Sequence, residues 1–130
     1  MSEYTRDRAL LIALISSGLI FIFGIGALMR AWPGGFAWTP AQPEYELMFV
    51  AVYATLGVFL VLTSRDPERN RGLILFAAWS SIVHGLVMAA QTVMDVSERM
   101  HLAGDVPALV GIGIVLLLLA PRGRPAMERA

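Results

Sequence analysis

Four long apolar segments, separated by short polar stretches, constrain this chain most strongly. They cover residues 9–29, 47–63, 72–93 and 106–120. A helix needs about 20 apolar residues to cross the hydrocarbon core of a bilayer. Hydrophobic residues make up 57% of the 130 residues and charged residues 15%, whereas soluble domains average roughly 45–50% and about 25%. The sequence therefore predicts an all-α integral membrane four-helix bundle, built as a single transmembrane domain over residues 1–130.

Polar residues and prolines around these segments set the expected helix bounds. Asp66 reads as an N-cap with Pro67 in the first helical position, so the third helix is expected to begin at 67. The predicted helices cover about 9–29, 45–63, 67–94 and 98–120. The predicted connections are an outer aromatic loop at 30–44, a cytoplasmic loop at 64–66 and a flexible tail at 121–130.

The start of the fourth helix has two interpretations. A helix limited to 106–120 would span only about 22 Å, less than the roughly 30 Å of the hydrocarbon core. In the first interpretation Asp105 caps this helix, with Pro107 in its first turn. In the second interpretation, Ser97 caps a longer helix that begins near 98 and kinks at Pro107. Asp105 would then lie within the membrane.

The distribution of arginine predicts the orientation of the chain. All ten basic residues are Arg, which we attribute to coding bias in a GC-rich bacterium, and there is no Cys. Eight arginines lie near the two termini or between the second and third helices, and two, Arg30 and Arg99, lie on the other side. Because positively charged loops face the cytoplasm, we predict a multi-pass protein of the bacterial inner (cytoplasmic) membrane with both termini cytoplasmic.

The stretch 31–46 is rich in aromatic residues, proline and glycine. Its aromatic residues are Trp32, Phe36, Trp38 and Tyr45. Amphipathic rings settle at the membrane–water interface. We therefore expect an interfacial anchor, with a lid over an outward-facing pocket as the alternative.

His84 lies near the middle of the third apolar segment, where an ionisable side chain is costly. It belongs to a partly polar stripe that consists of Ser80, His84, Met88 and Gln91. A stripe of small residues runs beside it and consists of Ala77, Ser81, Gly85 and Ala89. Small residues at this spacing let another helix approach closely. Both stripes are expected to face inward, with the third helix at the centre of the bundle.

Two interpretations of His84 follow from its depth. In one, a neutral imidazole hydrogen-bonds across helices, to Ser80 or to a residue of the second helix such as Tyr53. In the other, His84 contacts a lipophilic cofactor, with quinone, haem and pigment as candidates, or relays a proton. The candidate cofactor-binding residues are His84, Ser80, Trp79, Met88, Gln91 and Tyr53.

A second group of polar residues lies on the predicted outer side. His101 and Asp105 are four residues apart and would share one face of a helix. Together with Glu46 they form a candidate site for zinc or another divalent ion, and Asp95 and Glu98 fall on the same side of the membrane and could contribute to it. The alternative is structural: Asp105 caps the fourth helix and His101 lies in a solvated loop.

No catalytic motif appears in the sequence, whether a nucleotide loop, a Ser/His/Asp triad or an H-E-x-x-H helix. We therefore predict a non-catalytic accessory or scaffold subunit of a bacterial inner-membrane complex, docking through its helices. The expected partners are membrane lipids and either further copies of the chain or a larger membrane complex, and no nucleic acid. The alternatives are a binding module for a lipophilic cofactor that uses His84 and, third, a small transporter.

Two sequence motifs support a family resemblance. The stretches AWSSIVHG at 78–85 and GDVPAL at 104–109, within a match over roughly 44–122, resemble an uncharacterised family of small bacterial four-helix membrane proteins. The helix count and size are also similar to those of the DoxX-like subunits of quinone-linked membrane enzymes. Both resemblances imply a four-helix membrane fold, and neither assigns a catalytic residue.

Overall fold

The computed structural model describes residues 2–123, and its regular structure there consists of helices. The elements are α1 (Glu3–Leu19), the π-helix η1 (Ile20–Gly24), α2 (Ile25–Ala31), α3 (Pro33–Phe36), α4 (Pro43–Thr63), α5 (Arg71–Met94), the 3₁₀ helix η2 (Val96–Leu102) and α6 (Asp105–Leu119). Joined end to end they give four helices long and apolar enough to cross a membrane, over 3–31, 43–63, 71–94 and 96–119. The prediction of an all-α protein with four such helices is confirmed, and which side of the membrane holds the termini stays a prediction.

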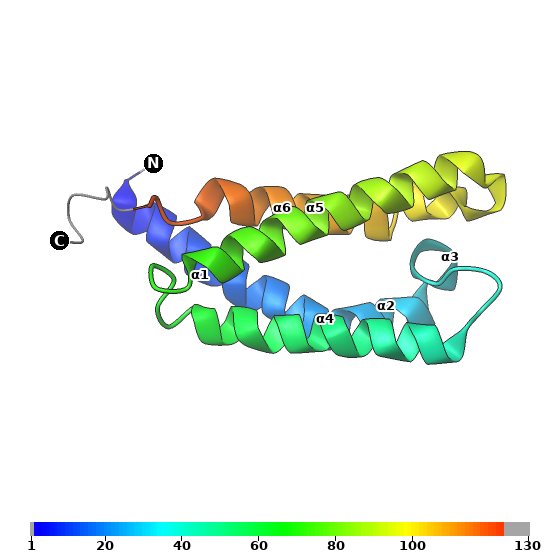
Figure 1. The fold of residues 1–130 in the computed structure, drawn as a ribbon, viewed down its shortest axis with the longest axis horizontal. Coiled ribbons are helices and arrows are strands. Elements are labelled where there is room, and N and C mark those ends of the chain that lie inside the picture. The colour runs from blue at the N-terminus through cyan, green and yellow to red at the C-terminus, as the bar shows by residue number, and fades with distance from the viewer. Residues whose placement is uncertain (1, 124–130) are drawn as a thin grey trace.

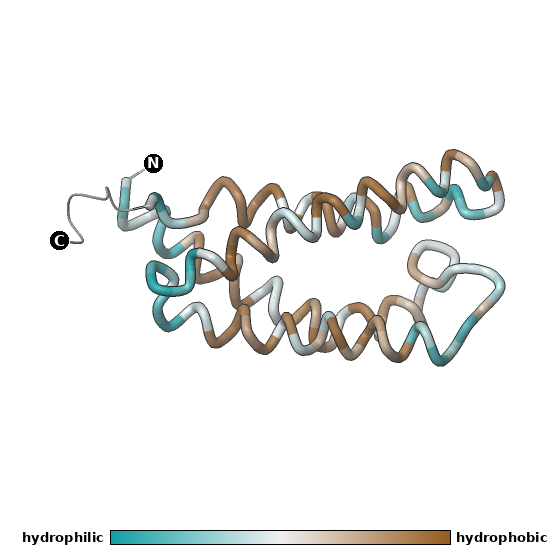
Figure 2. Tube along the Cα trace, viewed as in Figure 1, coloured by the Kyte–Doolittle hydropathy of each residue, from teal (hydrophilic) through white to brown (hydrophobic). Residues whose placement is uncertain are grey.

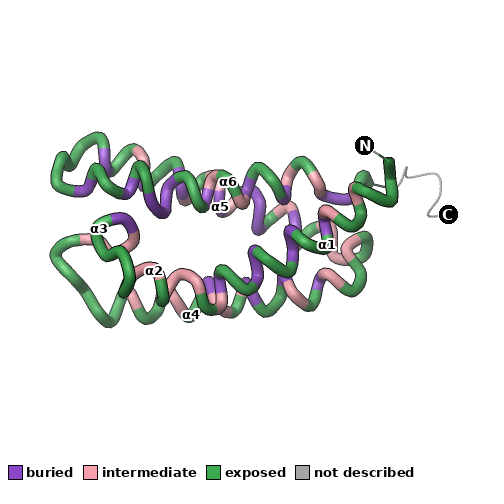
Figure 3. Tube along the Cα trace, turned by 180° about the vertical axis from the view of Figure 1, so that it is seen from behind, coloured by how far each residue is buried: buried purple, intermediate pink, exposed green. Residues whose placement is uncertain are grey.

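The molecule is apolar along the middle of its length and hydrophilic at its two ends (Figure 2), the pattern expected of a protein that crosses a membrane. Apolar residues occupy the middle of the helices, and hydrophilic residues concentrate in the 64–70 loop and at the two ends (Figure 2). The outward-facing sides of the helices are largely exposed (Figure 3). Since these exposed residues include many large apolar side chains, the helices present to their surroundings the surface expected to face lipid.

The four spans form two pairs, seen one above the other in Figure 1. The first span packs along α4, and α5 packs along α6. The pairs meet near the end of the molecule that holds the start of α1 and the end of α6, and they diverge toward the opposite end (Figure 1). We call that opposite end the distal end. The hydrophobic core includes one fully buried large aliphatic residue from each span: Leu14, Leu60, Ile74 and Leu116.

Close approach within each pair depends on glycine. A Cβ at Gly57 of α4 would lie 2.5 Å from the carbonyl oxygen of Gly18 in α1, and one at Gly113 of α6 would lie 2.6 Å from the carbonyl oxygen of Ala78 in α5. A Cβ at Gly85, in the small-residue stripe of α5, would lie 2.7 Å from Val110 Cγ2 of α6, so α6 of the same chain fills the stripe there. The expectation that the third helix is central is wrong, because α5 packs mainly along α6 and leaves Trp79 exposed.

Side chains at the terminal end satisfy the last carbonyls of α6. Arg6 of α1 donates to the carbonyl oxygen of Ala120, and Arg71 Nε donates to that of Pro121 at 2.8 Å. These bonds tie the start of α1 and the start of α5 to the end of α6. The flexible tail predicted from residue 121 lies, beyond Gly123, outside the described residues.

Two helices begin elsewhere than predicted. α1 begins at Glu3 instead of residue 9, because the Ser2 hydroxyl caps the Thr5 amide at 3.3 Å. α5 begins at Arg71 instead of residue 67. Asp66 does accept a hydrogen bond from a backbone amide, that of Arg69 at 3.2 Å, but it closes a turn that ends before the helix.

The fourth span combines parts of both interpretations. It begins early, as η2, and its cap is Asp95, which accepts hydrogen bonds from the Ser97 amide at 3.0 Å and the Ser97 hydroxyl at 2.6 Å. The bonds from the Ser97 side chain and backbone hold the pKa of Asp95 below its usual range. The break falls at 103–104, not at Pro107, and α6 begins at Asp105. Ser97 is therefore not the cap, and no kink at Pro107 is needed.

Candidate functional site

Two segments meet at the distal end of the molecule. One is the connection 32–42, which contains α3, and the other is η2 with the following turn. They pack against each other (Figure 1), and their backbones touch at Gly35 and Gly104, where a Cβ on Gly104 would collide with the Gly35 carbonyl. This contact brings residues about 60 positions apart in the chain into one polar site.

His101 lies at the centre of that site and is fully buried. Its Nδ1 lies 2.8 Å from Asp105 Oδ2, and its Nε2 lies 3.2 Å from Glu98 Oε2. The Trp38 ring stacks on the imidazole, with centroids 4.4 Å apart and planes at 24°. Glu98 Oε1 in turn accepts hydrogen bonds from the Thr39 amide, at 3.1 Å, and the Thr39 hydroxyl. We call Glu98, His101 and Asp105 the distal cluster.

Two buried atoms of the distal cluster lack a hydrogen-bond partner among residues 2–123. The first is His101 Nε2, which is close to Glu98 but not aligned with it for a hydrogen bond. The second is Oδ1 of Asp105. A buried polar atom left without a partner costs about 1–3 kcal/mol, so the Asp105 oxygen marks a place where a binding partner would be stabilised.

A cavity of about 380 Å³ lies beside the distal cluster, and all four spans contribute to it. Its polar lining residues are Glu46, His84, Gln91 and Asp105. Its apolar and aromatic lining residues are Met29, Phe36, Trp38, Tyr45, Phe49 and Met88. We call it the distal cavity. Gln91 and Tyr45 are exposed, so the cavity reaches the surface of the molecule.

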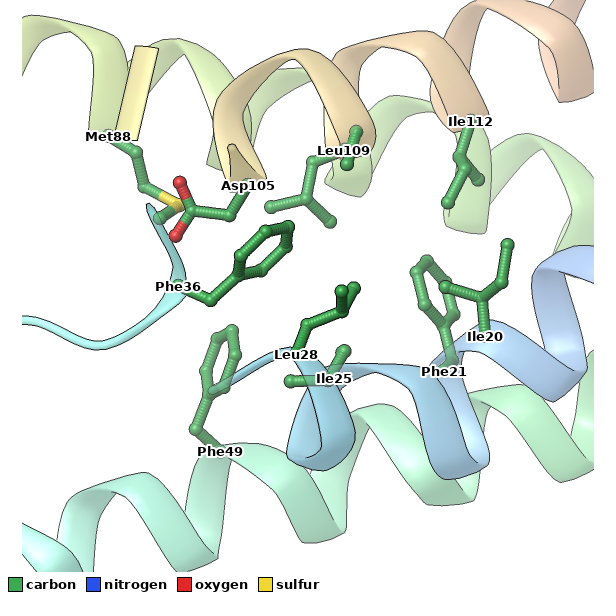
Figure 4. A pocket seen from close by; sticks show the side chains of 11 residues that line it. Ile20, Phe21, Ile25, Leu28, Phe36, Phe49, Met88, Asp105, Leu109 and Ile112 are labelled. Carbon is green, nitrogen blue, oxygen red and sulfur yellow. The ribbon is translucent and has the colours of Figure 1, made fainter. Parts of the chain in front are cut away.

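A smaller, apolar cavity of about 50 Å³ continues toward the middle of the molecule. Figure 4 shows its lining, in which Asp105, Met88, Phe36 and Phe49 are shared with the distal cavity. We call it the central cavity. Its far wall includes residues of the π-helix η1, where the Ile25 amide donates to the carbonyl of the residue five positions earlier. Such π-bulges in α-helices occur frequently at functional sites.

His84 is paired across helices, as one of the two interpretations predicts. Its Nδ1 lies 2.9 Å from the hydroxyl of Tyr53 on α4, not near Ser80. Phe49 packs edge-on against the imidazole, with centroids 5.2 Å apart. Since Nδ1 is occupied by Tyr53, Nε2 is the ring nitrogen left for a ligand in the distal cavity.

The candidate cofactor-binding residues divide into two groups. His84, Met88 and Gln91 line the distal cavity. Tyr53 does not line it, but its hydroxyl forms a hydrogen bond with His84. Ser80 and Trp79 lie outside it. The Ser80 hydroxyl bonds the carbonyl of Ala77 in its own helix at 3.3 Å, and Trp79 is 54% exposed on the outer side of α5.

The metal site predicted from His101, Asp105 and Glu46 does not form. Within residues 2–123, no three His, Asp or Glu side chains are arranged to hold an ion. The physical reason is that the two carboxylates near His101 flank opposite nitrogens of the ring, and Glu46 lines the distal cavity from α4. The structural alternative is wrong for His101, which is buried and not solvated. Asp105 bonds His101 and begins α6, and the N-cap of that helix is Gly104.

The sequence did not point to Phe49 as a residue of the site. The signal for Phe36 and Trp38 was the aromatic stretch 31–46, and the structure places both rings over the cavities. This position agrees with the lid interpretation of that stretch. Glu98 was placed on the same side as His101 by its position in the sequence, but its hydrogen bonds to Thr39 depend on the path of the 32–42 connection.

Comparisons with known proteins identify the family of the chain. Residues 4–126 match the profile of a family described as a family of unknown function (DUF6632). Searches of curated proteins and of solved structures found no match, so the architectural resemblance to DoxX-like subunits stays a prediction. The match covers nearly the whole chain, and the protein therefore belongs to this family of unknown function.

Proposed function

We propose that the protein binds a lipophilic small molecule with a polar head group in the distal cavity. The observation that carries the proposal is the composition of this cavity. Its volume of about 380 Å³ falls in the roughly 300–1,000 Å³ range of small-molecule sites, which combine apolar walls with a few convergent polar groups. The buried Asp105 oxygen without a partner is one of those groups.

The arrangement of the two cavities supports a mode of binding. The polar head would lie among Asp105, His84 and Gln91, and an apolar tail would extend past Met88 into the central cavity. Phe36, at the wall common to both cavities, would cover the ligand. The arginine distribution supports a bacterial inner membrane with both termini cytoplasmic, which would place the distal cavity on the outer side.

The structure weakens the case for an accessory or scaffold subunit. The small-residue stripe that suggested helix docking is filled by α6 of the same chain. A non-catalytic role and assembly with other subunits or copies remain predictions from the sequence. The ligand-binding function, by contrast, is supported by a cavity that polar, apolar and aromatic residues line together.

Extraction and mass spectrometry test the proposal. The wild-type protein, purified in mild detergent, is compared with His84→Leu and with Val83→Leu, a matched control at an exposed position of α5. Gln91→Trp at the cavity opening serves as a second variant that leaves the core intact. We expect one lipophilic molecule at near-stoichiometric amounts in wild type and control, and its depletion in both cavity variants. Identical extracts from all four proteins would refute the proposal.

A further inference from the structure

We infer that the ligand of the distal cavity is a lipophilic cation, such as a protonated amine or a quaternary onium ion. This inference rests on the proposed function and specifies the chemical class of its ligand. The first argument is the sign of charge around the site. Two carboxylic acid side chains line the distal cavity, Glu46 from α4 and Asp105 from α6, and no arginine among residues 2–123 lines either cavity.

The cations nearest the distal cavity do not neutralise these carboxylates. His101 lies between Glu98 and Asp105, so one imidazole faces two carboxylates. Arg30 of α2 lines a neighbouring hollow together with Glu46, but within residues 2–123 both close contacts between a basic and an acidic side chain involve His101. Among the described residues of the distal cavity and the distal cluster, acidic side chains therefore outnumber basic ones, with Glu46, Glu98 and Asp105 beside the two imidazoles of His84 and His101.

The second argument is the unpartnered oxygen of Asp105. The residue is only 9% exposed, and its Oδ1 has no hydrogen-bond partner among the described residues. Figure 4 shows its carboxylate between Met88 and Phe36, at the wall common to both cavities. A carboxylate accepts hydrogen bonds and donates none. An N–H of a protonated amine would donate a hydrogen bond to this oxygen. The positive charge of an onium ion would be attracted to it, whereas an anionic head group would be repelled.

The third argument is the aromatic lining. Four of the ten residues around the distal cavity are aromatic: Phe36, Trp38, Tyr45 and Phe49. The face of an aromatic ring attracts a cation by about 0.5–2 kcal/mol, with the larger values where water is excluded. Carboxylates together with aromatic rings in an apolar cavity form the chemical complement of a bulky organic cation. A neutral head group would gain little from Glu46 and little from the ring faces.

Binding of two ions of equal shape and opposite charge tests the inference. The protein is placed in nanodiscs of zwitterionic phosphatidylcholine, and empty nanodiscs provide the background. Equilibrium dialysis gives the Kd for tetraphenylphosphonium, for tetraphenylborate and for a neutral alkyl quinone. We expect tetraphenylphosphonium to bind at least about tenfold more tightly than tetraphenylborate. Asp105→Asn should weaken tetraphenylphosphonium by about tenfold or more and leave the neutral quinone within about twofold.

Glu46→Gln provides a second variant in case Asp105→Asn fails to fold, and it should act in the same direction. Equal affinity for the two ions, or full tetraphenylphosphonium affinity in both variants, would overturn the cation inference and leave the proposed function standing. If none of the three probes binds above background, the proposed function itself fails.

Discussion

Replacement of His101 by leucine should destabilise the protein more than most single substitutions. The imidazole lies between two buried carboxylates, at 2.8 Å from Asp105 and 3.2 Å from Glu98, and it stacks on Trp38. Leucine has a similar volume but offers no hydrogen bond and no charge. The variant therefore leaves the carboxyl groups of Glu98 and Asp105 buried on either side of an apolar side chain, without the imidazole that each of them contacts.

The expected cost follows from these contacts. Removal of one partner of a buried ion pair costs about 3–5 kcal/mol, because an uncompensated charge stays behind. Loss of a stacked ring pair adds about 0.5–1.5 kcal/mol. Part of this cost is recovered when a carboxylate takes up a proton, so we expect a net loss of about 3 kcal/mol in the free energy of unfolding.

Thermal and denaturant unfolding in detergent, followed by tryptophan fluorescence, measures this loss. The matched control is Met100→Leu, an exposed position in the same 3₁₀ helix. The triple variant Glu98→Leu, His101→Leu, Asp105→Leu should be more stable than the single variant, since an apolar replacement of a whole buried ionic group is often neutral. A single variant within about 0.5 kcal/mol of wild type, or a triple variant less stable than the single one, would refute the reasoning.

Three further predictions concern packing, pH and the His84 pair. Gly113→Leu should force α5 and α6 apart and lower the melting temperature sharply, whereas Gly111→Ala, with open space around its Cβ, should melt near wild type; equal melting of the two would contradict the packing argument. Asp95 has a lowered pKa in the folded protein, so its stabilising contribution is present above its ordinary pKa and is lost as the pH falls through the lowered one. The difference in melting temperature between wild type and Asp95→Ala should therefore shrink from pH 7 toward acid, and a constant difference would count against this cap. Tyr53→Phe removes the partner of His84 Nδ1 and should cost about 1 kcal/mol; an unchanged ¹⁵N spectrum of the imidazole would show that the pair does not form.

The number and type of the helices were predictable because they depend on local properties. About 20 apolar residues in a row can cross a bilayer as a helix, which satisfies the backbone hydrogen bonds within the segment. The sequence shows four apolar segments of 15 to 22 residues, which flanking residues extend. The helix starts were less predictable. Asp66 carries a capping signal, but its hydrogen bond to Arg69 closes a turn before α5, because one capping residue suits both turns and helices.

The candidate site was predictable in part. The spacing of His84, Met88 and Gln91 placed these residues on one face of a helix, and that face lines the distal cavity. The same spacing argument included Ser80, which bonds its own backbone instead. A helical stripe indicates which residues share a direction, but not how far along the helix a neighbouring cavity extends.

The sequence by itself determined that the chain forms four apolar helices, because helix formation in an apolar solvent is decided by the content of each segment. It did not determine which helices pair. The stripe of small residues on α5 could accept any helix that approaches closely, and only the folded chain shows that Val106 and Val110 of α6 lie against Gly85 of the stripe. Likewise, only the tertiary structure stacks Trp38 on His101 of the distal cluster and bonds Thr39 to Glu98. Contacts between residues so far apart in the chain follow from the paths of the connections and the divergence of the helix pairs, which are properties of the tertiary structure.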